Sequence, residues 1–253
     1  FAKNGLIWVG TSDQGLLLLY PKNFKSLISE FSEISKAGSF IYEAPDSTFW
    51  TDLVCGSMIQ IDQKKSQTKT VQTDALCPWG MLIDQQNNQW IIDIRLGLYK
   101  YDDGLTKVPG DILPSTNVFY SIYETEGGRK YMGTNLGIYE LINDSLHYIE
   151  NTSGLEQVYL FYEDRQDNLL FWSKSGLGFL EENNDFVIID KGSGLPTNDV
   201  RSVYQDVNLN YWIGTSMHGL YMYDNQNFYA LPYYDKRLGQ DVLCIIEDEL
   251  GNL

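Results

Sequence analysis

The 253-residue sequence contains few residues of the kinds that most often carry catalysis or charge-driven binding. It has two histidines and three cysteines, and 18 basic residues stand against 34 acidic ones. No apolar run approaches the ~18 residues that a membrane-spanning helix needs. A net charge of −16 opposes binding to nucleic acid phosphates or anionic membranes, because both require a basic surface. We therefore predict no transmembrane helix in this chain and no nucleic-acid partner.

Motifs for catalysis, metals and cofactors are also missing. His147 and His218 lie far apart in the sequence, and neither belongs to a cluster with metal-ligand spacing. The sequence has no phosphate-binding loop, no dinucleotide fingerprint and no G-x-S-x-G nucleophile elbow. We therefore predict no catalytic residue, no metal and no cofactor. Paired carboxylates for glycoside cleavage stay an open alternative, because many acidic residues are present.

The three cysteines, Cys55, Cys77 and Cys244, are odd in number and lack CxxC spacing. This pattern fits neither a disulfide framework nor a metal site. One disulfide is compatible with it, but we expect buried free thiols instead, because unpaired cysteine behaves as a small hydrophobic residue.

What the chain has in abundance is repetition. The stretch "NYWIGTSMHGLYMYD" (210–224) restates "GLIWVGTSDQGLLLLY" (5–20), and related hairpins lie between them at steps of about 41 residues. The aromatic residues that open the hairpins, here called the anchor aromatics, are Trp8, Phe49, Trp90, Tyr131, Trp172 and Trp212. The glycines that follow are Gly15, Gly56, Gly97, Gly137, Gly178 and Gly219. A fixed period of this length is typical of a repeat architecture.

Each repeat has the pattern of four short strands. In the last one, "DVRSVYQD" leads to "NYWIGTS", "GLYMYDN" and "FYALPYY", with alternating polarity, many β-branched and aromatic residues, and Asn, Asp or Gly between the strands. No segment has helical spacing. We predict an all-β fold, a β-propeller of four-stranded antiparallel blades with six repeats visible. The anchor aromatics should pack between blades, and the glycines should turn the chain into the third strand.

We expect one propeller domain or fragment over residues 1–253, cut from a longer chain at both ends. The chain opens on a second strand and ends on a first strand, "DVLCIIED". The terminal strand could complete the opening blade as a clasp. We favour the alternative, six blades of a larger, seven-bladed parent.

The stretch from 192 to 224 resembles the two-component-regulator propeller repeat. The matching residues are Gly194-Leu195-Pro196, Asn198, Val200, Asp206, Trp212-Ile213-Gly214-Thr215 and Gly219-Leu220. Residues 5–20 and the C-terminal segment fit the same pattern, Tyr131–Thr134 fits in degraded form, and the copies at Phe49 and Trp172 are weak. The patterns of WD, kelch and Asp-box repeats do not recur.

The resemblance implies the periplasmic sensor region of a bacterial hybrid two-component sensor kinase, as in Bacteroidetes. In that family the ligands are often glycan fragments. The implied partners are a small-molecule ligand such as an oligosaccharide, other domains of the same sensor chain and a second copy in a homodimer. The implied region is not itself an enzyme. A propeller glycoside hydrolase or lyase, and a protein-binding scaffold, are the alternatives.

Acidic residues are unevenly placed along the repeats. By the predicted strands, more than half of them fall in the first-to-second and third-to-fourth turns, which share one face of a propeller. Asp and Asn favour tight turns for conformational reasons, so this placement has a structural explanation. The opposite face, with the second-to-third turns and the crossovers between blades, is left less acidic.

We predict a ligand site on this less acidic face, because residues there differ between blades where packing alone would favour repetition. Sugar recognition needs an aromatic platform and a few polar or charged groups. The candidates are Trp79, Arg95, Phe119, Tyr159, Lys174, Arg201, His218, Tyr234 and Arg237. The alternative is that the aromatic members plug the channel or pack between blades and that the charged members are ordinary solvated loop residues.

Overall fold

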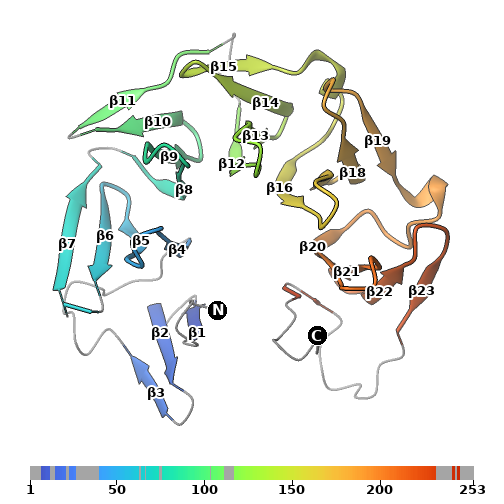
Figure 1. Cartoon of the computed structure of the whole chain (residues 1–253), viewed down its shortest axis with the longest axis horizontal. Helices are drawn as coiled ribbons and strands as arrows, with labels where there is room; N and C mark the ends of the chain where they lie inside the picture. Colours follow the sequence, from blue (N-terminus) through green and yellow to red (C-terminus); the bar gives the residue numbers. More distant parts are fainter. Residues whose placement is uncertain are drawn as a thin grey trace. The chain divides into compact units, whose positions relative to one another are not determined.

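The computed structural model describes residues 7–11, 15–20, 23–26, 40–62, 64–65, 67–73, 76–102, 104–110, 117–231, 241–242 and 244–245. These residues form six antiparallel sheets, one of three strands and five of four (Figure 1). Their only helical segments are two single 3-10 turns, η2 (Glu150–Thr152) and η3 (Lys191–Ser193). The all-β prediction and the six repeats are confirmed.

Every sheet is a meander whose strands follow chain order, and we call each sheet a blade. The strands of the first three blades are β1 (Ile7–Thr11), β2 (Gly15–Tyr20) and β3 (Asn23–Ser26); β4 (Tyr42–Glu43), β5 (Phe49–Val54), β6 (Ser57–Asp62) and β7 (Gln67–Gln72); and β8 (Pro78–Ile83), β9 (Gln89–Asp93), β10 (Gly97–Tyr101) and β11 (Leu105–Lys107). Those of the last three are β12 (Phe119–Glu124), β13 (Lys130–Thr134), β14 (Gly137–Ile142) and β15 (Ser145–Tyr148); β16 (Val158–Glu163), β17 (Leu169–Ser173), β18 (Gly176–Leu180) and β19 (Phe186–Ile189); and β20 (Val200–Gln205), β21 (Tyr211–Thr215), β22 (Gly219–Tyr223) and β23 (Phe228–Ala230).

The chain divides into two compact units, which are described separately. The first unit comprises residues 1–109 and 113–122, and the second comprises 110–112 and 123–253. Blades β1–β3, β4–β7 and β8–β11 belong to the first unit. Blades β16–β19 and β20–β23 belong to the second, as does blade β12–β15 apart from the first residues of β12.

Five blades share one turn between their first and second strands, which we call the Asp-turn. The backbone N–H of its first residue donates to the carbonyl of its fifth at 2.8–3.0 Å, and its fourth residue has a left-handed backbone. The five turns are 44–48, 84–88, 125–129, 164–168 and 206–210. In three of them the first residue is a buried aspartate, Asp84, Asp164 or Asp206.

The aspartate holds both the turn and the sheet. The Asp206 carboxylate accepts the N–H groups of Asn208 (2.8 Å) and Asn210 (2.9 Å) and the indole N–H of Trp212 (2.9 Å). Asp84 has the same role toward Trp90, whose indole N–H donates at 2.9 Å. The bond to Trp90 satisfies a buried donor that would otherwise have no partner, and the bonds to backbone N–H groups fix the turn.

The shared turn corrects the predicted alignment in two blades. Counting from the Asp-turn, the residue equivalent to Trp90 and Trp212 is Trp50 rather than Phe49, and Leu170 rather than Trp172. The glycine that starts the third strand of blade β16–β19 is Gly176, with a φ of 137°, and not Gly178. A Cβ on Gly178 would lie 2.1 Å from the Phe171 ring, so Gly178 is a packing glycine.

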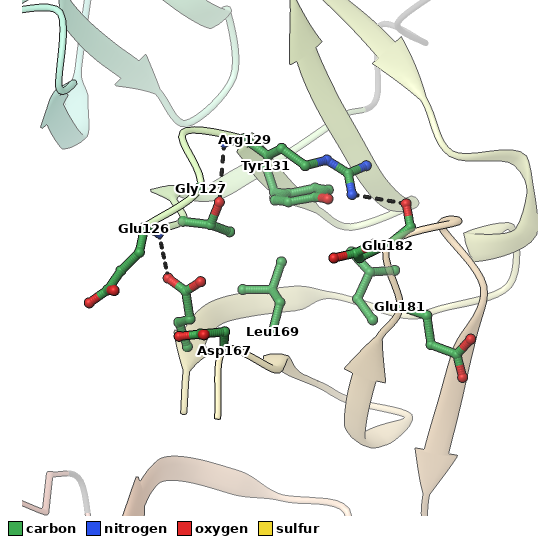
Figure 2. A pocket seen from close by; sticks show the side chains of 11 residues that line it. Glu126, Gly127, Arg129, Tyr131, Asp167, Leu169, Glu181 and Glu182 are labelled. Carbon is green, nitrogen blue, oxygen red and sulfur yellow. Dashed lines mark hydrogen bonds between the residues drawn. The ribbon is translucent and has the colours of Figure 1, made fainter. Parts of the chain in front are cut away.

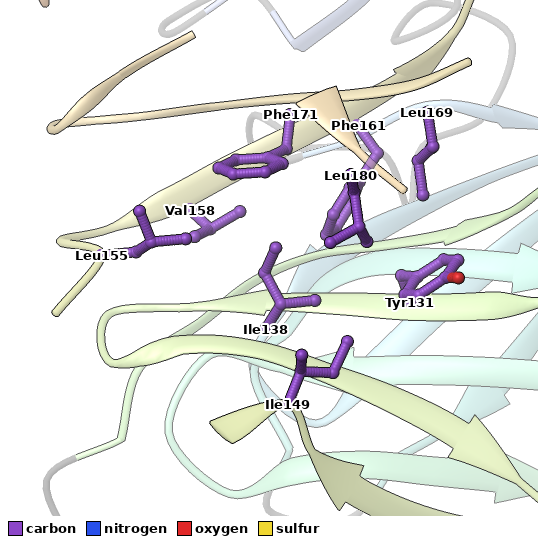
Figure 3. Packing of buried hydrophobic residues seen from close by; sticks show 9 residues of the cluster. All are labelled: Tyr131, Ile138, Ile149, Leu155, Val158, Phe161, Leu169, Phe171 and Leu180. Atoms are coloured by element: carbon purple, nitrogen blue, oxygen red, sulfur yellow. The ribbon is translucent and has the colours of Figure 1, made fainter. Parts of the chain in front are cut away.

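Within each unit, hydrophobic side chains of neighbouring blades pack face to face. In the first unit, Trp50 and Met58 of blade β4–β7 contact a cluster that includes Met81 and Ile91 of blade β8–β11. In the second unit, Figure 3 shows Tyr131 and Ile138 of blade β12–β15 against residues of blade β16–β19. Burial of each such side chain contributes roughly 1.5–3 kcal/mol. Of the predicted anchor aromatics, Tyr131 and Trp172 pack in such clusters between blades, as predicted, and Trp50, the neighbour of the predicted anchor Phe49, does so too.

A disulfide joins two of the three cysteines. Cys55 lies in the β5–β6 turn, and Cys77 lies just before β8 in the next blade. Backbone bonds bring the two segments together, because the Gly56 N–H donates to the Leu76 carbonyl at 2.6 Å and the Thr73 N–H donates to the Gly56 carbonyl at 2.8 Å. Cys244 is free and exposed. The prediction of buried free thiols was wrong, because this contact between blades is invisible in cysteine spacing.

The described part of blade β1–β3 has three strands. Half of the segment proposed as its fourth strand lies outside the described residues, so the clasp stays a prediction, as does the larger parent ring. In the described part of the chain, no helix has the length and hydropathy of a membrane span.

Candidate functional site

Each blade has two ends with different structural roles. The Asp-turn edge holds the turns between first and second strands and between third and fourth strands. The crossover edge holds the turns between second and third strands and the connections to the next blade. The predicted ligand site lies on the crossover edge.

A repeated β-bulge aims one residue of the first strand outward at the crossover edge. The register shifts between Pro78 and Gly80 in β8, between Val158 and Leu160 in β16, and between Val200 and Ser202 in β20. The residues skipped by the pairing are Trp79, Tyr159 and Arg201. Bulges often re-aim side chains beside binding sites. Three blades thus have the same β-bulge, but the side chain at the bulge differs from blade to blade.

Two of these bulge residues line a cavity of about 460 Å³ in the second unit, which we call the basic pocket. Tyr159 comes from β16 and Arg201 from β20, and Lys174 comes from the β17–β18 turn. Its lining residues are Tyr159, Lys174, Lys191, Thr197, Asn198, Asp199 and Arg201. The structure therefore brings together three of the nine predicted site residues.

The loop 190–199 that forms one wall is fixed by its own hydrogen bonds. Asp190 caps η3 by accepting the Ser193 N–H at 3.0 Å, and hydrogen bonds from Ser193 lower the pKa of Asp190. Asn198 accepts the Lys191 N–H at 3.0 Å, and the buried Thr197 hydroxyl accepts the Asp199 N–H at 3.2 Å. The wall is thus organised before any ligand binds.

The cations of the basic pocket have weak protein partners. Lys174 Nζ lies 3.6 Å from Glu156 Oε2, and Arg201 Nη2 lies 3.2 Å from Asp199 Oδ1. All four side chains are 43% or more exposed. Exposed ion pairs of this kind contribute about 0–1 kcal/mol, so a ligand can replace them at little cost.

Two further predicted residues lie at the crossover edge of the first unit. Trp79 is 41% exposed, and Arg95 is exposed in the β9–β10 turn. The buried Asp93 carboxylate fixes both segments by accepting the N–H groups of Cys77 (2.6 Å) and Arg95 (2.8 Å).

Of the remaining four predicted residues, only His218 is exposed among those described. It lies in the β21–β22 turn, where its Nδ1 is 2.8 Å from the Ser216 carbonyl oxygen. Phe119 is 2% exposed, and its ring packs under Gly97. The Asp-turn of its blade starts at Thr125 and not at Glu124, so the position equivalent to Trp79 is Tyr120, and Phe119 is a core residue. Tyr234 and Arg237 lie outside the described residues.

Sequence reasoning missed four residues of the basic pocket, Lys191, Thr197, Asn198 and Asp199. Asn198 belongs to the repeat motif, which gave it a structural explanation and drew attention away from its exposed side. One repeat earlier, the position equivalent to Lys191 is Glu150, which begins η2 as Lys191 begins η3, and this reversal of charge between blades was the available signal.

A second cavity, of about 270 Å³, lies at the Asp-turn edge of the same unit, and we call it the acidic pocket (Figure 2). Its lining residues are Thr125, Glu126, Gly127, Arg129, Tyr131, Glu163, Asp167, Leu169, Leu180, Glu181 and Glu182. The five acidic members all come from turns where the sequence predicted acid to gather. No group of side chains with metal-binding geometry occurs among the described residues.

The acidic pocket is held together by internal contacts. Arg129 bonds Glu140 Oε1 (2.8 Å), the Glu182 carbonyl (2.9 Å) and Asn184 Oδ1 (3.0 Å), and its guanidinium lies over the Tyr131 ring. Burial raises the pKa of Glu163, and the negative charges of Glu126 and Asp167 raise it further. The hydrogen bond that Glu163 accepts from the Glu126 N–H acts in the opposite direction and lowers its pKa, but does not outweigh them. Burial also raises the pKa of Tyr131 to about 12. The hydrogen-bonding groups of the Arg129 guanidinium are therefore used by contacts within the protein.

The meander blades and the packing between them define a protein of the β-propeller class. Similar solved structures include the extracellular domain of BT3049, a proposed hybrid two-component system from B. thetaiotaomicron, with a TM-score of 0.68 and 15% identity over 98% of this chain and 41% of that one. The extracellular domain of BT4673, a proposed one-component system from the same organism, has a TM-score of 0.77 and 18% identity over 99% of this chain and 35% of that one.

Virginiamycin B lyase from Staphylococcus aureus is also similar, with a TM-score of 0.69 and 10% identity over 92% of this chain and 83% of the lyase. No protein-family model and no curated protein matches the chain. The chain spans less than half the length of the two extracellular domains. At these identities the similarity confirms the fold class, and the first of these structures is the extracellular domain of a protein of the kind that the repeat resemblance implies.

Proposed function

We propose that this chain is a ligand-sensing part of the extracytoplasmic region of a bacterial two-component sensor and that its basic pocket binds a carbohydrate fragment. The repeat resemblance supports the sensor class, and so does the structural similarity to two extracellular domains across nearly the whole chain. The remaining domains of the same sensor chain are then its signalling partners, and a second copy is a further one.

The disulfide supports the location independently of any similarity. Disulfides form and persist in oxidising compartments such as the bacterial periplasm and are rare in the cytosol. Cys55 and Cys77 are joined across two blades. The disulfide is therefore consistent with a domain that lies in the periplasm.

The observation that carries the ligand proposal is the convergence of Tyr159, Lys174 and Arg201 on one cavity. Its volume of about 460 Å³ lies within the range of ~300–1,000 Å³ of small-molecule sites. A half-buried tyrosine offers an apolar ring for a sugar face, and the surrounding polar groups can bond its hydroxyls.

The pocket also suggests how binding is transmitted. Its walls come from two blades, β16–β19 and β20–β23, and from the crossover between them. A ligand that contacts both blades and the crossover binds most tightly to one arrangement of these three elements. Binding therefore shifts the population toward that arrangement.

The test is calorimetric titration of the purified chain with a panel of oligosaccharides. We expect a member of the panel to bind, and we expect Tyr159→Ala and Arg201→Ala each to weaken binding about tenfold. Lys69→Ala is the matched control, because Lys69 is exposed on the outer strand β7 of the other unit.

Three outcomes would contradict the proposal. Binding that survives both pocket substitutions moves the site elsewhere. Cleavage of the oligosaccharide, seen by chromatography, favours the hydrolase or lyase alternative. No binding by any panel member, together with capture of a protein domain, favours the scaffold alternative.

A further inference from the structure

We infer that the ligand of the basic pocket carries an anionic substituent, so that the sensed carbohydrate is an acidic glycan fragment. This inference rests on the proposed function and specifies the ligand class. Its basis is the charge of the cavity compared with the charge of the chain.

The lining of the basic pocket reverses the charge balance of the protein. The chain has almost twice as many acidic as basic residues, yet this cavity has three cations, Lys174, Lys191 and Arg201, and one carboxylate, Asp199. The acidic pocket of the same unit has five carboxylates and one guanidinium. Three of the 18 basic residues therefore line this one cavity.

The cations come from separate segments and therefore surround the cavity. Lys174 lies in the β17–β18 turn, Lys191 begins η3, and Arg201 lies on the β20 bulge. Folding brings them together although Lys174 and Arg201 are far apart in sequence. Arginine can bind a carboxylate or sulfate through two parallel hydrogen bonds, and lysine acts as a point charge beside it.

The fold makes little use of these cations, in contrast to Arg129. The Arg129 guanidinium has three hydrogen-bonded partners and covers an aromatic ring. Lys174 and Arg201 each have one exposed ion pair, and Lys191 has no carboxylate within ion-pair distance among the residues that the structure describes. Their charge is therefore available to a ligand.

Three carboxylates interact with Lys174 or Arg201 and would compete with an anionic ligand for them. Glu156 pairs with Lys174, and Asp199 pairs with Arg201. Asp241 is held by the Ser216 hydroxyl and the Met217 N–H, both at 2.8 Å, and these bonds together with the charge of Arg201 lower its pKa. Only Asp199 lines the cavity, and its pairing with Arg201 is exposed enough for an anionic group to displace it.

The experiment compares charged oligosaccharides with neutral counterparts of the same size. One arm uses trigalacturonic acid and its carboxyl-reduced form, and the other uses a sulfated heparin disaccharide and its desulfated form. Titrations are run at low and high salt. We expect an acidic member to bind, its neutral counterpart to bind about tenfold or more weakly, and salt to weaken the acidic member. The arm in which binding is observed shows whether the anionic group that the pocket recognises is a carboxylate or a sulfate.

Lys191→Gln and Arg201→Gln should each weaken the acidic member severalfold at unchanged unfolding midpoint, and Lys69→Gln should not. Equal binding of charged and neutral members overturns the anion inference and leaves the proposed function standing. Binding of an acidic member that neither pocket substitution affects also overturns it. Absence of binding in every arm overturns the anion inference, and it overturns the proposed function as well if no member of the wider oligosaccharide panel binds.

Discussion

The two edges of the second unit are built from the same blades and have opposite characters. At the Asp-turn edge, one turn recurs with the same backbone hydrogen bond and with a left-handed backbone at its fourth residue. Its buried aspartates, Asp164 and Asp206, accept hydrogen bonds from the turn. At the crossover edge, a bulge recurs but presents Tyr159 in one blade and Arg201 in the next. The comparison teaches that repetition of a side chain marks a structural role, whereas variation on a repeated backbone marks a surface available for recognition.

The largest expected effect concerns the one covalent link at the crossover edge. The double substitution Cys55→Ala/Cys77→Ala opens a loop of 22 residues and should lower the free energy of unfolding by about 3 kcal/mol. Urea denaturation measures the loss, with Cys244→Ala as the control. An unchanged midpoint would show that backbone bonds alone hold these blades together.

The next largest loss of stability is expected when the aspartate of an Asp-turn is removed. Asp206→Ala leaves the indole N–H of Trp212 and two backbone N–H groups without their acceptor, and should lower the free energy of unfolding by about 2 kcal/mol. Ligand binding at the basic pocket should stay unchanged. If Asp206→Ala abolished binding in a folded protein, the separation of the two edges would be wrong.

The same aspartate should give the stability a defined pH dependence. Burial by itself raises the pKa of Asp206, but hydrogen bonds from Trp212, Asn210 and Asn208 outweigh burial and hold it below its usual value. A depressed pKa contributes stability that is full above the unfolded-state pKa of about 4 and is lost as the pH falls through the folded pKa. The stability difference between wild type and Asp206→Asn should therefore shrink as the pH falls below about 4. A difference that is constant from pH 7 to 2.5 would contradict this assignment.

A matched pair of tryptophans tests the hydrogen bond alone. Trp90 donates to Asp84, whereas Trp50 occupies the same position above Ala44, and its buried indole N–H has no acceptor among the described residues. Trp90→Phe should therefore cost about 1 kcal/mol more than Trp50→Phe in thermal or urea unfolding. Equal costs would mean that the aspartate contributes through the turn and not through the indole.

The smallest stability effect is expected in the basic pocket. Arg201→Ala removes an exposed ion pair and should change the free energy of unfolding by no more than about 0.5 kcal/mol. A loss comparable to that of Asp206→Ala would place Arg201 among the structural residues and break the contrast between the edges.

The predicted site residues differ in where the structure places them. Tyr159 and Arg201 were proposed because an equivalent position varies between blades, and both line the basic pocket. Phe119 was assigned to that position by counting from Glu124, one residue before the true turn. A single-residue slip in a strand moves a side chain to the opposite face, so Phe119 became a core residue.

Local pattern alone determined the repeat, the four-stranded blade, the absence of long helices from the residues that the structure describes and the concentration of acidic residues in the turns of one edge. These features depend on strand periodicity and turn chemistry, which act over a few residues. Tertiary structure decided the partners of segments distant in sequence. It joined Cys55 to Cys77 and brought Lys191, Tyr159 and Lys174 to one cavity. Such contacts follow from how blades pack on one another, and no spacing within a single repeat encodes them.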